Sequence, residues 1–134
     1  MKVFLDTNVL VSAVATRGLC ADVLREVLIS HHLIVSAHLL AELQRVFRKK
    51  LNLPENLISE FLKMIQQDAL FSTPSAKPDV NLQDKSDLPI LSSALSGGAD
   101  LLVTGDSELL ELRKIGNMEI VSPRGFWEKL KARS

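Results

Sequence analysis

Short apolar runs alternate with amphipathic segments along this chain, and the alternation predicts strands followed by helices. Four short, mostly apolar runs predict strands: residues 2–5, 33–36, 100–104 and 118–122. Val3, Phe4 and Leu5 of the first run suit a strand that is buried on both faces of a sheet. Residues 69–72 are a weaker strand candidate. The first run leads directly into Asp6-Thr7-Asn8 at the start of a helix, and we interpret it as the central strand of a parallel sheet.

Apolar residues recur at three- and four-residue steps between these runs, which indicates amphipathic helices. Ser36 is expected to cap one of the helices, and Gly97-Gly98 to end another. Residues 75–83 are expected to form a loop. The helices are predicted at residues 9–15, from 19 to about 31, from 37 to about 51, from 54 through 65, from 84 through 95, around 108–112, and from 123 onward.

This order of elements predicts a three-layer α/β/α sandwich with a central, mostly parallel sheet of about five strands and right-handed crossovers. The chain has 134 residues, which is the size of one domain, and no linker or repeat divides it. We therefore expect residues 1–134 to form a single domain.

Acidic residues stand where such a sheet would bring them together. Asp6 and Asp106 directly follow strands, Asp87 opens a helix, and Glu42 lies about one turn into another helix. The carboxyl ends of parallel strands share one edge, so these four carboxylates can converge. Together they would require cations, and ligation by oxygen alone favours Mg²⁺ or Mn²⁺ over zinc, as one or two ions.

A structural explanation is open for Asp6, for Glu42 and for one of Asp84 and Asp87. Asp6 could simply cap the following helix, and Glu42 could be a surface residue paired with Arg45. Asp84 and Asp87 are three residues apart at a helix start, where capping readily explains one of them.

Charge and composition narrow the candidate partners. Sixteen basic and sixteen acidic residues give a net charge of zero, so a polyanion would have to be held locally. Arg45, Arg48 and Lys49, followed by Lys50, could contact a phosphate backbone or merely complement a helix C-terminus.

The single Cys20 excludes an internal disulfide, and no run is long enough to span a bilayer, so we expect a cytoplasmic protein without membrane contact.

Together these segments resemble a PIN domain. The similar stretches are Val3-Phe4-Leu5-Asp6-Thr7-Asn8-Val9-Leu10, the later Glu42, Asp87 with the following Leu88-Pro89-Ile90-Leu91-Ser92-Ser93-Ala94-Leu95, Gly98-Ala99-Asp100-Leu101-Leu102-Val103-Thr104-Gly105-Asp106, and the ending Ile120-Val121-Ser122-Pro123-Arg124-Gly125-Phe126. The resemblance covers nearly the whole chain in order, spacing and strand context.

The resemblance implies a metal-dependent ribonuclease, in many bacterial and archaeal members the toxin of a toxin–antitoxin pair similar to VapC. By that analogy Asp6, Glu42, Asp87 and Asp106 hold Mg²⁺ or Mn²⁺, and a metal-bound water attacks the phosphodiester to leave a 5′-phosphate and a 3′-hydroxyl. Asn8 and Thr104 match small polar positions that orient ligands or water, and Asp84 is an additional acid near the site. The resemblance also implies a homodimer and an antitoxin protein as partner.

One departure from the family pattern concerns the second ion. Many relatives carry a further acid directly after the position of Asp87, whereas this chain has Leu88.

The alternative functions are an RNA-processing PIN nuclease without an antitoxin and a non-catalytic PIN-fold interaction protein. Phosphoryl hydrolysis from a small metabolite is disfavoured, because Asp6 has no second Asp two residues later and no lysine follows a strand.

Overall fold

In the part of the chain that the structure describes, the central sheet has six strands in the order β3-β2-β1-β4-β6-β5. The structure is a computed structural model that describes residues 1–75 and 77–133. Parallel pairing joins the first five strands in this order, and only the edge strand β5 is antiparallel to its neighbour β6. The strands are β1 Lys2–Leu5, β2 His32–Ser36, β3 Leu70–Ser72, β4 Leu101–Val103, β5 Lys114–Ile115 and β6 Met118–Val121.

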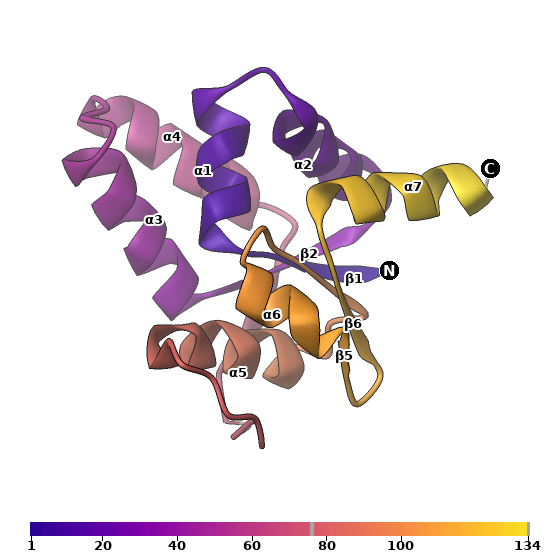
Figure 1. Ribbon diagram of the computed structural model, residues 1–134. Helices are drawn as coiled ribbons and strands as arrows, with labels where there is room; N and C mark the ends of the chain where they lie inside the picture. Colours follow the sequence, from indigo (N-terminus) through magenta and orange to yellow (C-terminus); the bar gives the residue numbers. More distant parts are fainter. Residues whose placement is uncertain (76, 134) are drawn as a thin grey trace.

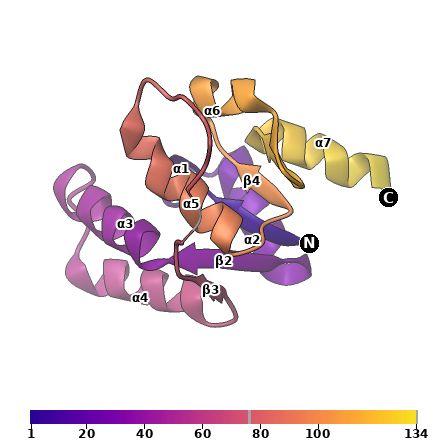
Figure 2. The ribbon, with the colours of Figure 1, turned by 90° about the horizontal axis from the view of Figure 1, so that it is seen from below.

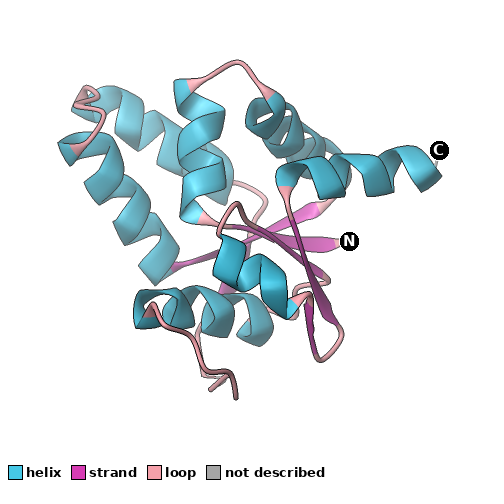
Figure 3. Cartoon of the chain, viewed as in Figure 1, coloured by secondary structure: helices cyan, strands magenta, loops and turns pink. Residues whose placement is uncertain are grey.

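Helices cover both faces of the sheet, which confirms the predicted α/β/α fold class. Figure 1 shows α1, α2 and α7 on one side of the strands and α5 and α6 on the other, and Figure 3 shows the strands enclosed between these layers. The helices α3 and α4 pack together as a hairpin. The helices are α1 Thr7–Ala15, α2 Leu19–Ser30, α3 Ala37–Lys49, α4 Glu55–Gln66, α5 Leu88–Ser96, α6 Ser107–Leu112 and α7 Pro123–Arg133, with a 3₁₀ turn, η1, at Lys85–Asp87.

The three central strands form the middle of the hydrophobic core, as their continuous apolar runs predict. Val3, Phe4 and Leu5 of β1 are fully buried, and so are Ile34 of β2 and Leu102 of β4. Burial on both faces explains why these strands do not alternate between apolar and polar residues. A helix begins shortly after each of these strands ends. Because the strands are parallel, the first residues beyond them lie at the same edge of the sheet and close together.

The register of β1 and β4 fixes the edge at which the candidate site lies. Leu5 pairs with Val103, and the backbone N–H of the next residue, Asp6, donates to the Val103 carbonyl at 2.9 Å. On the other side of β1, Ser36 ends β2 and caps α3 by accepting the N–H of Leu39 at 3.3 Å. Figure 2 shows β2 leading into α3, with α5 lying across the sheet near this edge.

Two parts of the structure differ from the sequence prediction. The strand β5 was not predicted: Gly116 and Asn117 form a two-residue hairpin turn between β5 and β6, with Gly116 at a positive φ of 58°. The predicted helix from residue 84 is divided, because Lys85–Asp87 form the 3₁₀ turn and the α-helix begins at Leu88. Asp84 therefore caps the 3₁₀ turn, while Asp87 stands at the start of α5.

No single helix among the described residues is both long and apolar enough to cross a membrane; α1 and α2 pass such a test only as a pair, and they are bent by 109° at their junction.

Candidate active site

Asp6 is the most buried of the candidate acids, with 5% of its surface exposed. It stands at the N-cap position of α1, and its Oδ1 accepts the backbone N–H of Thr7 at 2.7 Å. Its Oδ2 accepts the hydroxyl of Thr104 at 2.7 Å. Burial raises the pKa of the Asp6 carboxyl, the negative charges of Glu42 and Asp106 add to the rise, and these two hydrogen bonds oppose it.

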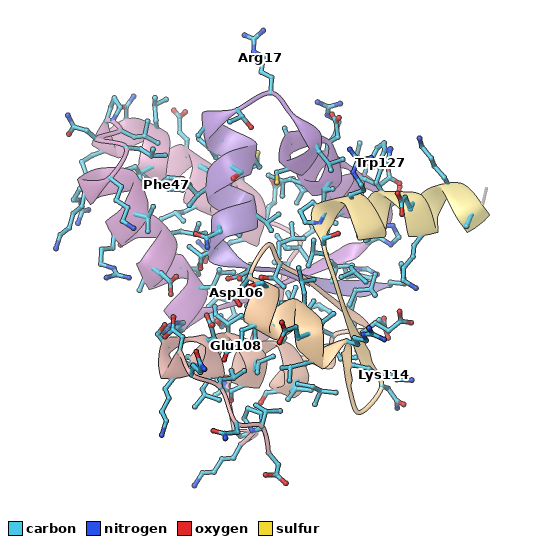
Figure 4. All side chains as sticks on the ribbon, in the orientation of Figure 1. Arg17, Phe47, Asp106, Glu108, Lys114 and Trp127 are labelled. Carbon is cyan, nitrogen blue, oxygen red and sulfur yellow. The ribbon has the colours of Figure 1, made fainter. Side chains whose placement is uncertain are left out.

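Thr104 connects the ends of the two central strands. Its buried hydroxyl donates to Asp6 and accepts the backbone N–H of Asp106 at 3.1 Å. Asp106 in turn caps α6, because its Oδ1 accepts the N–H of Leu109 at 3.1 Å. Figure 4 labels Asp106 near the start of α6. Capping thus uses one oxygen of Asp106 and leaves its other oxygen available.

Asp87, which was predicted among the four converging acids, and Asp84, which was predicted as an additional acid, have different roles in the structure. Asp84 is exposed, and its Oδ1 accepts both the N–H (3.0 Å) and the hydroxyl (2.5 Å) of Ser86. The carboxylate of Asp84 therefore stabilises the local turn. Asp87 occupies the N-cap position of α5 but makes no side-chain capping bond. Its Oδ2 is buried without a hydrogen-bond partner. A buried carboxylate oxygen without a partner is costly, and in this position it is available to a ligand.

The electrostatic environment of Asp87 is dominated by other acids. Its pKa is raised to about 6, first by burial and then by the negative charges of Asp106, Asp84, Asp6 and Glu108. The pKa of Asp6 in turn responds to the charges of Glu42 and Asp106, so Asp6 and Asp87 both respond to Asp106, and Glu42 joins the group through Asp6. Their charges repel, and a cation bound among them would relieve the repulsion.

Glu42 lies on α3 at the border of this group. Its side chain is 27% exposed, and its Oε2 is 3.2 Å from Nε2 of His38, one helical turn earlier. The predicted alternative, an ion pair between Glu42 and Arg45, is not formed among the described residues; His38 takes that place. This contact engages one of the two carboxylate oxygens of Glu42.

The donor set fits a hard divalent cation by its chemistry, because it consists of carboxylate oxygens with mutual repulsion and one buried oxygen that lacks a partner. In the arrangement described for residues 1–75 and 77–133, however, no three His, Cys, Asp or Glu side chains stand so that they could hold an ion together. Binding an ion at this edge therefore requires side chains such as Glu42 and Asp87 to reorient.

Of the two small polar residues that come after Asp6, the structure buries Thr7 and exposes Asn8. Asn8, the predicted auxiliary residue, is exposed on α1. Thr7 is 2% exposed, and its hydroxyl is buried without a hydrogen-bond partner. Thr7 and Asn8 are both small, polar and within two positions of Asp6, so only the helix geometry decides which of them faces inward.

The basic residues predicted as possible RNA contacts separate into two groups. Arg48 forms a two-pronged ion pair with Glu55 of α4, in which Nη2 donates to Oε2 at 3.0 Å and Nε donates to Oε1. Arg45 and Lys49 are exposed and line a shallow depression together with Val46 and Lys50. Arg45 and Lys49 follow Glu42 by three and seven residues, so they lie on the same side of α3 as the candidate site.

Glu108 is a residue of the site that the sequence analysis missed. Both of its carboxylate oxygens accept backbone N–H groups from the loop before Asp87: Oε2 from Gln83 at 2.7 Å and Oε1 from Asp84 at 3.3 Å. The available signal was the spacing Asp106-Ser107-Glu108 after a strand, which is equally typical of an acid near a helix N-terminus.

A family model described as a PIN domain matches residues 2–108, which include every acid discussed above. The chain belongs to the PIN-domain family. The match extends from β1 into α6 and thus contains both central strands and all the helices that carry the candidate site. A search of curated proteins found no match to this PIN domain.

Solved structures share the fold of this PIN domain. One is the crystal structure of VapBC2 from Rickettsia felis bound to a DNA fragment from its promoter, with 22% identity and a TM-score of 0.62 over 91% of this chain and 98% of that one. Another is VapBC-1 from nontypeable Haemophilus influenzae, with 20% identity and a TM-score of 0.61 over 92% of this chain and 99% of that one. At these identities the likeness establishes the fold.

Proposed function

We propose that this PIN domain is a Mg²⁺- or Mn²⁺-dependent ribonuclease that hydrolyses RNA phosphodiester bonds, and that it is the toxin of a toxin–antitoxin pair. The observation that carries the nuclease proposal is the group of interacting carboxylates at the carboxyl ends of β1 and β4, with the unpartnered oxygen of Asp87 among them. Membership of the PIN-domain family supports the same reaction class.

In this proposal Asp6, Glu42, Asp87 and Asp106 hold one or two divalent ions. The bound metal would supply a water that ionises near neutral pH and positive charge for the scissile phosphate. Thr104 keeps Asp6 oriented through its hydroxyl, and the N–H of Leu109 keeps Asp106 oriented. Arg45 and Lys49 would contact phosphates of the RNA strand outside the acidic centre, where their charge offsets the repulsion between RNA and the acids.

The toxin assignment is supported by the two solved structures described above, each of which is a VapBC structure with this fold. We propose an antitoxin protein as the partner of this chain and a homodimer as its assembly. Co-expression with the neighbouring reading frame, followed by size-exclusion chromatography with light scattering, tests both. The expected results are a stable complex and, for the chain alone, twice the monomer mass; a monomer that captures no partner would favour an RNA-processing nuclease without an antitoxin.

Cleavage of a mixed-sequence, 5′-labelled single-stranded RNA tests the nuclease proposal. The purified protein is assayed with EDTA, Mg²⁺ or Mn²⁺, beside Asp6→Asn and Asp87→Asn, which remove a charge at nearly constant size. Asp68→Asn is the matched control, because Asp68 is an exposed acid outside the site. We expect metal-dependent cleavage that leaves a 5′-phosphate and a 3′-hydroxyl, lost in both site variants and retained in the control.

The nuclease proposal is contradicted if the protein, freed of any partner, neither binds metal nor cuts RNA. The protein is unfolded, separated from any co-purifying partner and refolded before the assay. If it then binds no Mn²⁺ by calorimetry and cuts no RNA, the catalytic proposal fails and a non-catalytic interaction protein of the PIN fold takes its place.

A further inference from the structure

Glu108 ties the segment that carries Asp87 to the helix that follows Asp106. Its two carboxylate oxygens accept the N–H groups of Gln83 and Asp84, which precede the 3₁₀ turn at Lys85–Asp87. Glu108 lies on α6, the helix that Asp106 caps. Figure 4 labels Asp106 and Glu108 close together at the start of this helix. The carboxylate thus joins two segments that each carry a proposed metal ligand.

The segment before Asp87 has few other means of being held at this point. No helix or strand lies between Ser72, the end of β3, and Lys85 among the residues that the structure describes. Leu82 is buried and anchors the segment in the core, but Gln83 and Asp84 beyond it are exposed. Hydrogen bonds from N–H groups to an ionised carboxylate are roughly twice as strong as neutral ones, so this pair of contacts is a strong constraint that ties the start of the turn to another element of the fold.

The charge of Glu108 has a cost at this position. It is one of the negative charges that disfavour ionisation of Asp87. Both carboxylate oxygens of Glu108 are held by backbone N–H groups of one segment, which is the arrangement of a structural clamp. The contacts of Asp6 differ, because its oxygens accept from Thr7 at the start of its own helix and from Thr104 at the end of the neighbouring strand.

We propose that Glu108 is a positioning residue for Asp87: by holding the N–H groups of Gln83 and Asp84, it sets where the 3₁₀ turn begins and thereby keeps Asp87 facing Asp106. This inference rests on the proposed function. It implies that Asp87 and Asp106 are kept in register before metal binds, through α6.

Glu108→Gln and Glu108→Ala test this role, with Glu111→Gln as the matched control. The glutamine keeps the length of the side chain but offers only one acceptor oxygen, so one of the two contacts is lost. Glu111 is exposed on the same helix one turn later, and its substitution removes the same charge. Amide hydrogen exchange is measured on the metal-free protein, and Mn²⁺ affinity is measured by calorimetry.

We expect exchange at Gln83 and Asp84 to accelerate by roughly ten- to a hundredfold in Glu108→Ala, because both charge-assisted bonds are lost, and less in Glu108→Gln. Exchange in β1 and β4 should stay as in the wild type, which shows that the fold is retained. Mn²⁺ affinity should fall by about ten- to a hundredfold, as is typical when a residue that orients a ligand is removed. Glu111→Gln should change neither quantity.

Three results would overturn the proposal, and they are distinguishable. Unchanged exchange at Gln83 and Asp84 in Glu108→Ala would show that Glu108 does not restrain the segment. Faster exchange with unchanged Mn²⁺ affinity would show that it secures a loop without positioning Asp87. A wild-type protein that binds no Mn²⁺ would overturn the proposed nuclease function and the positioning role with it, whatever the exchange data show.

Discussion

The hydroxyl of Thr104 donates a 2.7 Å hydrogen bond to Oδ2 of Asp6, although the two residues are 98 positions apart in the chain. They meet because β1 and β4 are parallel neighbours in register, with Leu5 beside Val103. Both residues are buried, so without this bond Oδ2 of Asp6 and the hydroxyl hydrogen of Thr104 would lose the partner that they have in each other. The bond also favours the ionised form of Asp6, because it lowers a pKa that burial raises.

We expect Thr104→Val to be destabilising and to raise the pKa of Asp6 further. Valine has nearly the shape of threonine but leaves Oδ2 of Asp6 and the N–H of Asp106 without this partner, at a cost of about 1–3 kcal/mol in the free energy of unfolding. Urea denaturation measures the first effect, and NMR titration of the Asp6 carboxyl measures the second. Thr104→Ser keeps the hydroxyl and should retain the pKa of the wild type. A valine variant as stable as the wild type would contradict the role of the bond.

The raised pKa of Asp87 predicts how the stability of the metal-free protein depends on pH. The pKa is about 6 in the folded state and 3.8 without the fold, so the folded state binds more protons between these values. Stability contributed by protonated Asp87 is therefore fully present below about pH 3.8 and is lost as the pH rises to about 6. We expect Asp87→Asn to flatten this decrease and to raise the melting temperature at pH 7.

Asp84→Asn is the control with the opposite sign. Hydrogen bonds from Ser86 lower the pKa of Asp84, so its contribution is present above pH 3.8 and is lost as the pH falls. Removing Asp84 loses this contribution but also removes one of the charges that raise the pKa of Asp87, so any rise of the melting temperature at pH 7 should be smaller than in Asp87→Asn. Thermal unfolding between pH 4 and pH 7 in EDTA compares the two variants. An Asp87→Asn protein that melts at or below the wild-type temperature at pH 7 would show that repulsion at this carboxylate does not destabilise the fold.

The sequence predicts the fold well because the central strands are buried on both faces, and the resulting apolar runs are separated by clear helix starts. It does not predict β5, since a strand of two residues, Lys114 and Ile115, carries no periodicity. The turn Gly116-Asn117 between β5 and β6 was the available signal. The convergence of Asp6 and Asp106 follows from topology alone, because residues after neighbouring parallel strands must meet.

The remaining features of the site depend on contacts that the sequence does not reveal. Asp84 and Asp87 look equivalent at a helix start, and only the 3₁₀ turn assigns capping to the former. Arg48 looks as available as Arg45, but the packing of α3 against α4 brings Glu55 to it. Glu108 bonds to backbone N–H groups more than twenty residues away, and no pattern of residue types along the chain encodes such a contact.

The ion pair of Arg48 predicts that the basic residues of α3 differ in RNA binding. Each side chain that neutralises a phosphate adds roughly 0.7 to the slope of log affinity against log salt for a single strand. We expect Arg45→Gln and Lys49→Gln each to reduce the slope by about this amount, and Arg48→Gln to change it little, because its guanidinium is already paired with Glu55. Binding of a labelled RNA to the inactive Asp6→Asn background at several salt concentrations measures the slopes. Equal losses for all three variants would show that the pair with Glu55 opens on binding.

The last prediction concerns Gly97, where α5 ends against the sheet. A Cβ atom added there would lie 2.7 Å from Cγ2 of Ile34 and 3.2 Å from Cβ of Ser72. The close approach of α5 to β2 and β3 therefore depends on the absence of a side chain at residue 97. The backbone at Gly97 has an ordinary φ of −80°, so the requirement is for space. The hydroxyl of Ser72 supports the same approach by donating to the Ser93 carbonyl at 2.7 Å.

We expect Gly97→Ala to lower the free energy of unfolding by about 1–3 kcal/mol, as is typical of overpacking, because the fully buried Ile34 has little room to move. Gly105→Ala is the control, since an added Cβ meets nothing within 4 Å there. Urea denaturation of the metal-free proteins compares them. Because α5 carries Asp87 at its other end, a shift of this helix should also weaken Mn²⁺ binding by Gly97→Ala. A Gly97→Ala protein with wild-type stability and Mn²⁺ affinity would mean that α5 can move away from the sheet without disturbing Asp87.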